Sequence, residues 1–313
     1  MTIHKTVLLK EAVDNLKLKE GMTVVDATLG GGGHSLDILR EISSTGRLIS
    51  IDRDQEAIDR FEKRIEKENV NGENMILVKS NFSEVDSVLD SFKIEKVDGI
   101  LADFGLSSDQ LDSKERGFSF RVNAELDMRM DKSQELTAKV VVNTYDFKDL
   151  ERIIRIFGDE RYAKRIARGI IENRKENEIG TTNDLINIIE KVIPEKDKRK
   201  KIHFATKTFQ AIRMEVNGEL ESIEKFLRDS VGLLRSKGRL AVISFHSGED
   251  RVVKNIFKEY SKGCECPSNF PVCVCGKLPD VKLITRKPIL PSDQEIEENL
   301  RSRSAKLRVI EKI

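Results

Sequence analysis

Three acidic residues in the first third of the sequence each close a short apolar segment. Asp26 follows V-V, Asp52 follows L-I-S-I, and Asp103 follows G-I-L-A. Short runs rich in β-branched residues are typical of buried strands, and an open α/β sheet binds its ligand outside the carboxyl ends of such strands. Carboxylates at that edge can accept hydrogen bonds from ribose hydroxyls or from an amine. We therefore expect a nucleotide or nucleoside site there.

A glycine run, Gly30 to Gly33, separates the first of these strands from an apolar helical pattern. Glycine tolerates positive φ and lets a ligand approach the backbone, and the helix that follows presents unpaired N–H groups. The run alone can be a plain loop, but together with Asp52 it favours a ribose over a simple helix cap. Ser35 stands where a dinucleotide fingerprint needs its third glycine or alanine, which disfavours a nicotinamide dehydrogenase. Asp26 before the loop suggests the cofactor loop of a methyltransferase.

The elements that must position these residues follow from hydrophobic periodicity. We predict strands at 23–27, 47–52, 75–79, 97–103 and 239–245, with short edge strands at 281–285 and 306–311. Only helical patterns occupy 134–213, among them a helix at 183–192 for which Thr182 is the expected cap. This pattern predicts an α/β sheet with an all-helical domain inserted between its fourth and fifth strands. The expected parts are 1–112 and 216–313 for the sheet, and 113–215 for the insertion.

Further polar and aromatic residues follow the later strands. Phe82 comes after the third strand and suits an adenine ring, although ordinary core packing explains it equally well. Ser107 and Ser108 follow the fourth strand and can accept hydrogen bonds from an amine, or can simply stabilise a turn. His246 follows the fifth strand, where it is either a base, an RNA contact or a structural histidine.

The charge balance does not by itself identify a partner. Lys and Arg number 55 against 54 Asp and Glu, so the net charge of +1 does not indicate a nucleic-acid binder. Two basic runs stand out, at 196–201 and 301–308, and in the second run serines alternate with arginines, both of which contact phosphates. A solvated surface is the plain alternative for each. The sequence has neither a signal-peptide core nor an apolar run of membrane length, so a cytoplasmic protein is expected.

Four cysteines lie in one segment, Cys264, Cys266, Cys273 and Cys275. Two C-x-C pairs could hold zinc, but structural sites usually have C-x-x-C or longer spacing, and no histidine lies near. Free thiols are the alternative, and we assign no metal to the functional site.

Eight stretches together carry a family resemblance. They lie at 26–35 (D-A-T-L-G-G-G-G-H-S), 103–112 (D-F-G-L-S-S-D-Q-L-D), 115–120 (E-R-G-F-S-F), 126–131 (L-D-M-R-M-D), 208–213 (T-F-Q-A-I-R), 215–217 (E-V-N), 242–247 (V-I-S-F-H-S) and 301–308 (R-S-R-S-A-K-L-R). In these stretches the sequence resembles the MraW/RsmH family of bacterial S-adenosylmethionine-dependent ribosomal RNA methyltransferases. The chain departs from the family pattern at Phe104, Asp109, Gly248 and Leu300.

The resemblance implies a Rossmann-like class I methyltransferase core that methylates the exocyclic N4 of a cytidine in small-subunit ribosomal RNA, at the decoding centre. The implied partner is this RNA or the small ribosomal subunit, with no DNA or membrane partner. The cofactor contacts that it implies are Gly32, Gly33, His34, Asp52, Phe82, Asp103 and Gln110. For catalysis we expect Asp103, Ser107 and Ser108 to accept the hydrogens of the amine, and for substrate binding we expect His246, Arg301 and Arg303.

Two other functions were weighed. A ribosome-assembly factor could keep the fold and bind RNA without turnover, although the intact cofactor loop argues against it. A DNA or protein methyltransferase is the second, and the absence of an N/D-P-P-Y/F motif after the fourth strand disfavours the usual amino-methylating DNA enzymes.

Overall fold

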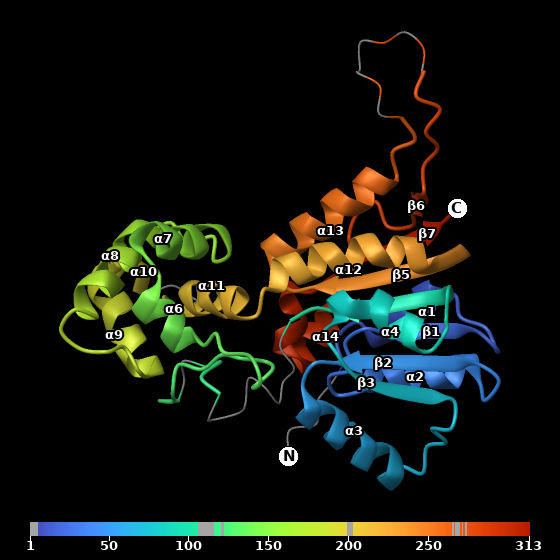
Figure 1. Cartoon of the computed structure of the whole chain (residues 1–313), viewed down its shortest axis with the longest axis horizontal. Helices are drawn as coiled ribbons and strands as arrows, with labels where there is room; N and C mark the ends of the chain where they lie inside the picture. Colours follow the sequence, from blue (N-terminus) through green and yellow to red (C-terminus); the bar gives the residue numbers. More distant parts are fainter. Residues whose placement is uncertain are drawn as a thin grey trace. The chain divides into compact units, whose positions relative to one another are not determined.

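The computed structural model describes residues 6–105, 116–119, 122–198, 203–264, 266, 270, 272 and 274–313. The chain forms two compact units, one made of Met1–Gly105 with Leu220–Ile313 and the other of Leu106–Glu219 (Figure 1). Among the described residues, no helix has the length and apolar character needed to cross a membrane.

The first unit is built on a seven-stranded sheet with the strand order β3-β2-β1-β4-β5-β7-β6. Strands β1 to β5 pair in parallel, whereas β7 runs antiparallel to both β5 and β6. The predicted α/β fold with a mostly parallel sheet is therefore confirmed. The strands are β1 Thr23–Asp26, β2 Arg47–Asp52, β3 Met75–Lys79, β4 Val97–Asp103, β5 Leu234–Ser244, β6 Val281–Leu283 and β7 Lys306–Lys312.

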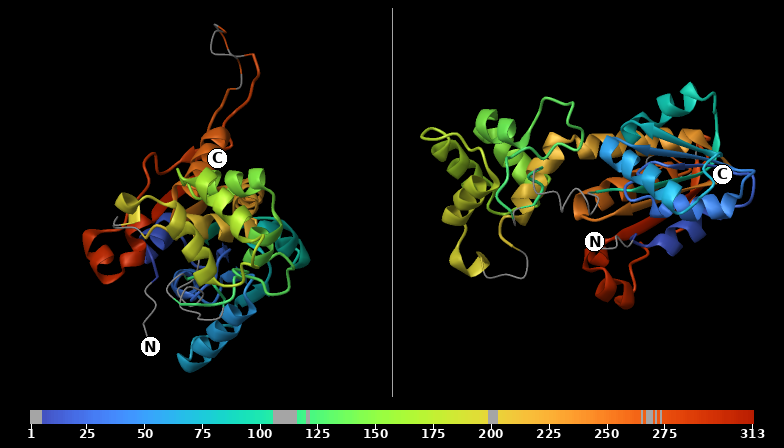
Figure 2. Two further views of the ribbon diagram at one scale, coloured as in Figure 1. Left: turned by 90° about the vertical axis from the view of Figure 1, so that its left-hand side faces the viewer. Right: turned by 90° about the horizontal axis from the view of Figure 1, so that it is seen from below.

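Helices cover both faces of this sheet (Figure 2). Consecutive strand residues point to opposite faces, so Val24 packs with α1 and α2, while Val25 belongs to the core formed with α4, α12 and α13. Because the central strands are buried on both sides, their sequences are continuous apolar runs. The helices are α1 Leu9–Leu16, α2 Gly33–Ile42, α3 Gln55–Lys67, α4 Val85–Ser91, α12 Glu219–Leu233, α13 Ser247–Tyr260 and α14 Asp293–Glu298, with short 3₁₀ helices η1 Phe82–Glu84 and η2 Leu300–Ser304.

Three aromatic rings join the carboxyl ends of β3 and β4 to α12. The ring of Phe104 lies 5.3 Å from that of Phe82 and 5.9 Å from that of Phe226, measured between centroids. Tilted and edge-on pairs at such distances are favourable beyond the apolar area that they bury. The departure from the family pattern at Phe104 thus has a packing role directly after the strand that ends in Asp103.

The second unit is helical in its described part and has its own apolar core. One detail of the sequence analysis is wrong here. Thr181, and not Thr182, caps α9, because its side chain and that of Asp184 form a reciprocal capping box. Thr182 is buried, and its hydroxyl donates to the carbonyl oxygen of Val122. The helices are α6 Ala138–Thr144, α7 Phe147–Ile156, α8 Ala163–Asn173, α9 Thr182–Val192, α10 Glu195–Lys198 and α11 Thr206–Val216.

Three of the family stretches meet inside this unit. The buried guanidinium of Arg116 donates to the carbonyl oxygens of Arg129 and Met130, at 2.9 and 2.6 Å. Asn217, at the end of α11, donates to the carbonyl oxygen of Met128 and accepts from the N–H of Met130. Since buried backbone groups need partners, these two side chains fix the loop that carries L-D-M-R-M-D. The stretches at 115–120, 126–131 and 215–217 therefore share a structural role.

Candidate active site

The strand order places the three aspartates of the sequence analysis at one edge of the sheet. β1 lies between β2 and β4, and Asp26, Asp52 and Asp103 end these neighbouring parallel strands. The order of the strands along the chain reverses beside β1, and the crevice outside the carboxyl ends at such a point is the usual ligand site of an open α/β sheet.

Asp26 fastens the start of the glycine loop. Its buried carboxylate accepts from the hydroxyl of Ser35 at 2.6 Å and from the N–H of Thr28 at 3.1 Å. The Ser35 hydroxyl also lies 2.8 Å from that of Ser50 on β2. Burial raises the pKa of Asp26 to about 6, even though these two hydrogen bonds favour the ionised form.

Asp52 holds the loop from the neighbouring strand. One of its carboxylate oxygens accepts from the N–H of Gly30 at 2.8 Å, and the other accepts from the N–H of Asp54 at 2.9 Å. Burial raises the pKa of Asp52 above its ordinary value. A carboxylate oxygen can accept more than one hydrogen bond, so this position remains suited to ribose hydroxyls.

Packing beneath the loop explains its glycines. Gly32 has a φ of +74°, and a Cβ on it would lie 2.0 Å from the ring of Phe61. A Cβ on Gly33 would lie 1.8 Å from Oγ1 of Thr6. Both distances are far below van der Waals contact. The sequence argument attributed these glycines to the approach of a ligand, but close packing by the protein requires them independently.

Asp103, at the same edge, combines a buried carboxylate oxygen with a strongly raised pKa. Its backbone N–H donates to Oγ1 of Thr28 at 2.6 Å, which ties the end of β4 to the second residue after β1. Its Oδ1 atom is buried, and within the described residues it has no hydrogen-bond partner. Burial, and then the nearby carboxylates of Asp26 and Glu249, hold the pKa of Asp103 well above its ordinary value.

These groups fit the cofactor that the family resemblance implies. A buried acceptor without a partner is costly unless a ligand supplies a donor, and among the residues that the structure describes nothing donates to Asp103 Oδ1. The neighbouring carboxyl groups favour a positively charged ligand. S-adenosylmethionine carries a sulfonium and an ammonium group, so its charge matches this edge of the sheet.

Phe82 and His34 also lie close to this edge. Phe82 starts η1 at the third residue after the end of β3, and its half-buried ring packs on Phe104, so it keeps some surface for a ligand. His34 is buried in the first turn of α2. Ser107, Ser108 and Gln110 lie outside the described residues, and their roles stay predictions.

His246 has a structural role that the sequence analysis gave only as an alternative. It is the N-cap of α13, and its Nδ1 accepts from the N–H of Glu249 at 3.3 Å. Glu249 in turn accepts from the N–H of Phe245 at 2.8 Å. Glu249 is not among the residues predicted from the sequence, although an acid three residues after a cap is the signature of a capping box. Substrate binding by His246 stays a prediction.

The basic run at 301–308 divides into two parts. Arg301 and Arg303 are exposed on η2, at the surface of the sheet unit. Arg308, in contrast, is buried on β7 and its Nε donates to Asp250 of α13 at 2.7 Å. Only the first part of the run is therefore placed to meet a phosphate backbone.

We predict that Gly32→Ala lowers the affinity for S-adenosylmethionine at least about tenfold, because the new methyl group must displace the Phe61 ring. Gly30→Ala is the matched control. It also has a positive φ, of +49°, but its Cβ would meet nothing nearer than 3.9 Å. Isothermal titration calorimetry with both variants measures the difference. Equal losses of affinity in the two variants would show that backbone strain, and not the clash with Phe61, is the reason why glycine is required at position 32.

The raised pKa of Asp26 predicts a dependence of stability on pH. The folded protein binds a proton at Asp26 more tightly than the unfolded chain, so this group lowers the free energy of unfolding as pH rises from about 4 through 6, by roughly 3 kcal/mol in full. Asp26→Asn removes this titration. The stability of the variant relative to the parent should therefore increase with pH between 4 and 7.

Urea unfolding of both proteins across this range tests the prediction. Asp37→Asn serves as the control, because it removes a carboxylate that forms a surface ion pair with Arg40. Its stability relative to the parent should show no such trend. A difference between Asp26→Asn and parent that stays constant with pH would contradict the assignment.

Comparison with known proteins identifies the family. The family model described as the MraW methylase family matches residues 1–313. A ribosomal RNA small subunit methyltransferase H of Clostridium botulinum (strain Kyoto / Type A2) is 51% identical over 310 residues, covering 99% of both chains. The protein of the same name from Finegoldia magna is 49% identical over 311 residues, covering 99% of this chain and 98% of its own. The resemblance of the sequence stretches is confirmed, and the chain belongs to the MraW methylase family.

Proposed function

We propose that this protein transfers the methyl group of S-adenosylmethionine to the exocyclic N4 of a cytidine in small-subunit ribosomal RNA, at the decoding centre. Family membership over the whole chain and the printed name of its relatives support the reaction class and the RNA. The structural observation that carries the chemistry is Asp103 Oδ1, a buried acceptor at the carboxyl edge whose partner is absent from the described residues.

The methyl group on a sulfonium is already activated, so the protein must mainly position the amine and exclude water. The lone pair of the cytosine amine is delocalised into the ring. Accepting the hydrogens of the amine helps to direct this lone pair toward the methyl group. Asp103 provides a carboxylate for this purpose, and Ser107 and Ser108 are further candidates on the stretch that follows it.

The proton that leaves the nitrogen needs an acceptor. The pKa of Asp103 is held well above its ordinary value by burial and by Asp26 and Glu249, which makes it a stronger base than an exposed carboxylate. Only the ionised carboxylate of Asp103 can accept this proton, so the rate of methyl transfer should decline as pH falls through the pKa of Asp103.

RNA recognition is assigned to surfaces outside the cofactor loop. The exposed arginines Arg301 and Arg303 suit phosphate oxygens. The inserted helical segment, 113–215, with the stretch E-R-G-F-S-F, is proposed as a second RNA surface. The cytidine must leave its stack to reach a pocket at the sheet edge.

The proposed place of action of this protein is the cytoplasm, and the proposal includes no DNA or membrane partner.

The decisive experiment is methyl transfer from labelled cofactor to small ribosomal subunits that lack the native modification, followed by nucleoside analysis. We expect N4-methylated cytidine, and no incorporation into subunits that are already modified. Tight cofactor binding without label on subunits or on extracted RNA would favour the assembly-factor function instead.

We predict that Asp103→Ala lowers the rate of methyl transfer at saturating cofactor by at least about 10²-fold. Asp98→Asn is the matched control, because Asp98 lies on the same strand and instead binds Arg235 at 2.8 Å and the N–H of Thr23. It should keep its turnover. Single-turnover kinetics with both variants measure the effect, and normal turnover by Asp103→Ala would remove Asp103 from the mechanism.

A further inference from the structure

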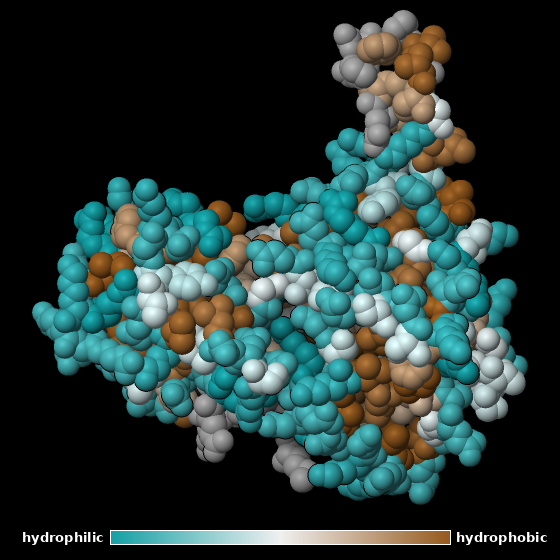
Figure 3. All heavy atoms as spheres, viewed as in Figure 1, coloured by the Kyte–Doolittle hydropathy of each residue, from teal (hydrophilic) through white to brown (hydrophobic). Residues whose placement is uncertain are grey.

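The segment 261–280, which we call the arm, connects α13 to β6, and its described residues project away from the sheet (Figure 1). Apolar side chains along it face solvent (Figure 3), and Phe270, Val272, Val274 and Leu278 are 51%, 69%, 74% and 80% exposed. The described part of the arm therefore lacks an apolar core of its own. A short segment without a core usually needs a covalent or metal cross-link to keep one conformation.

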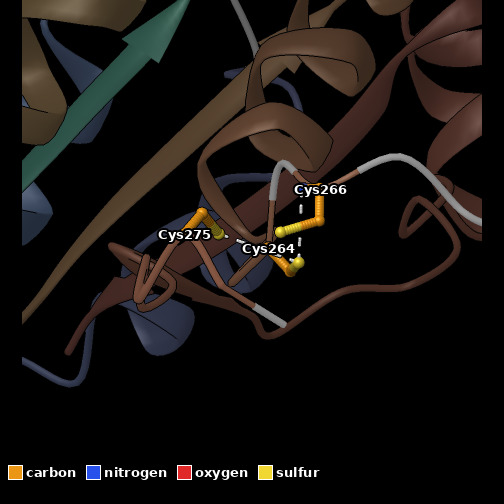
Figure 4. Close-up of side chains that lie close together, drawn as sticks. All are labelled: Cys264, Cys266 and Cys275. Atoms are coloured by element: carbon orange, nitrogen blue, oxygen red, sulfur yellow. Dashed lines mark hydrogen bonds between the residues drawn. The ribbon is translucent and has the colours of Figure 1, made fainter. Parts of the chain in front are cut away.

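The side chains of three cysteines in this arm lie close together (Figure 4). The Sγ atoms of Cys264, Cys266 and Cys275 all lie within 4.8 Å of one another, and the Sγ atoms of Cys264 and Cys275 are 3.8 Å apart. At 3.8 Å, the Sγ atoms of Cys264 and Cys275 are too far apart for a disulfide between them. Zn–S bonds of about 2.3 Å in a tetrahedron place neighbouring sulfurs about 3.8 Å apart. The separation of the Cys264 and Cys275 sulfurs equals this distance, and the third sulfur lies within 4.8 Å of both.

Backbone N–H groups donate to two of the sulfurs. The N–H of Cys266 donates to Cys264 Sγ, and the N–H of Val274 donates to Cys266 Sγ, both at 3.4 Å. Hydrogen bonds of this kind orient the ligands of a metal site. The donors come from both sides of the arm, so they also fix the orientation of the sulfurs before a metal binds.

We propose that Cys264, Cys266 and Cys275 bind a structural Zn²⁺ ion that holds the arm in shape. Thiolate ligands in a tetrahedral arrangement suit zinc or an iron–sulfur cluster, and three sulfurs around one point at this spacing suit a single ion. Structural zinc takes four ligands. The sequence carries a fourth cysteine, Cys273, which lies outside the described residues. The proposal is independent of the methyl-transfer reaction.

The test is the metal content of the full-length protein, purified under reducing conditions and dialysed against a weak chelator. We expect about one zinc per chain by inductively coupled plasma mass spectrometry. Cys264→Ser should lose the ion. Leu278→Ser changes an exposed residue of the same arm that offers no zinc-binding thiol, and should keep it. Co²⁺ in place of zinc should give the visible absorption bands of tetrahedral thiolate coordination in the parent and in Leu278→Ser, but not in Cys264→Ser.

Limited proteolysis gives a second measurement. Removing zinc with a strong chelator should expose the arm to cleavage while circular dichroism of the remaining protein stays the same. Zinc that persists in Cys264→Ser would overturn the proposal as adventitious binding. Iron in place of zinc, a mass two hydrogens lower for each cysteine pair, or four freely titrating thiols without metal would each overturn it as well.

Discussion

One buried carboxylate joins the elements on which the site depends. Asp26 ends β1, accepts from Ser35 in α2, and through that hydroxyl reaches Ser50 on β2. The glycine loop lies between two of these attachment points, so its path is set by hydrogen bonds that have no water as competitor. The energetic cost of burying Asp26, visible in its raised pKa, is compensated by the order that it imposes on the cofactor loop.

The sequence predicted the central strands well because each is a continuous apolar run between polar residues. The bounds of β2, β3 and β4 agree with the prediction. β5 does not, since it begins at Leu234, where the predicted strand begins at 239. The register shifts between its pairings with Val97 and Gly99, and such a bulge leaves no periodic signal in the sequence. The short helices α4, α10 and α14 were not predicted, because their seven, four and six residues hardly define a helical period.

The positions of the site residues were predictable where the strand order alone determines them. Parallel strands bring their carboxyl ends to one edge, so the positions of Asp26, Asp52 and Asp103 follow from counting strands. The close contacts beneath the loop were not predictable. Phe61 lies under Gly32 and Thr6 under Gly33 only through tertiary packing, which no local pattern encodes.

The strand order also has a consequence for synthesis on the ribosome. β5 has β4 on one side and β7 on the other, and β7 is the last strand of the chain. When β5 emerges, its outer edge has no partner until residues 306–312 follow. Before that, β4 remains an edge while the whole second unit is made. Unpaired edges are sites of aggregation. A nascent chain of this protein therefore exposes first the edge of β4 and then that of β5, and the sheet has all its strands only after β7 has been made.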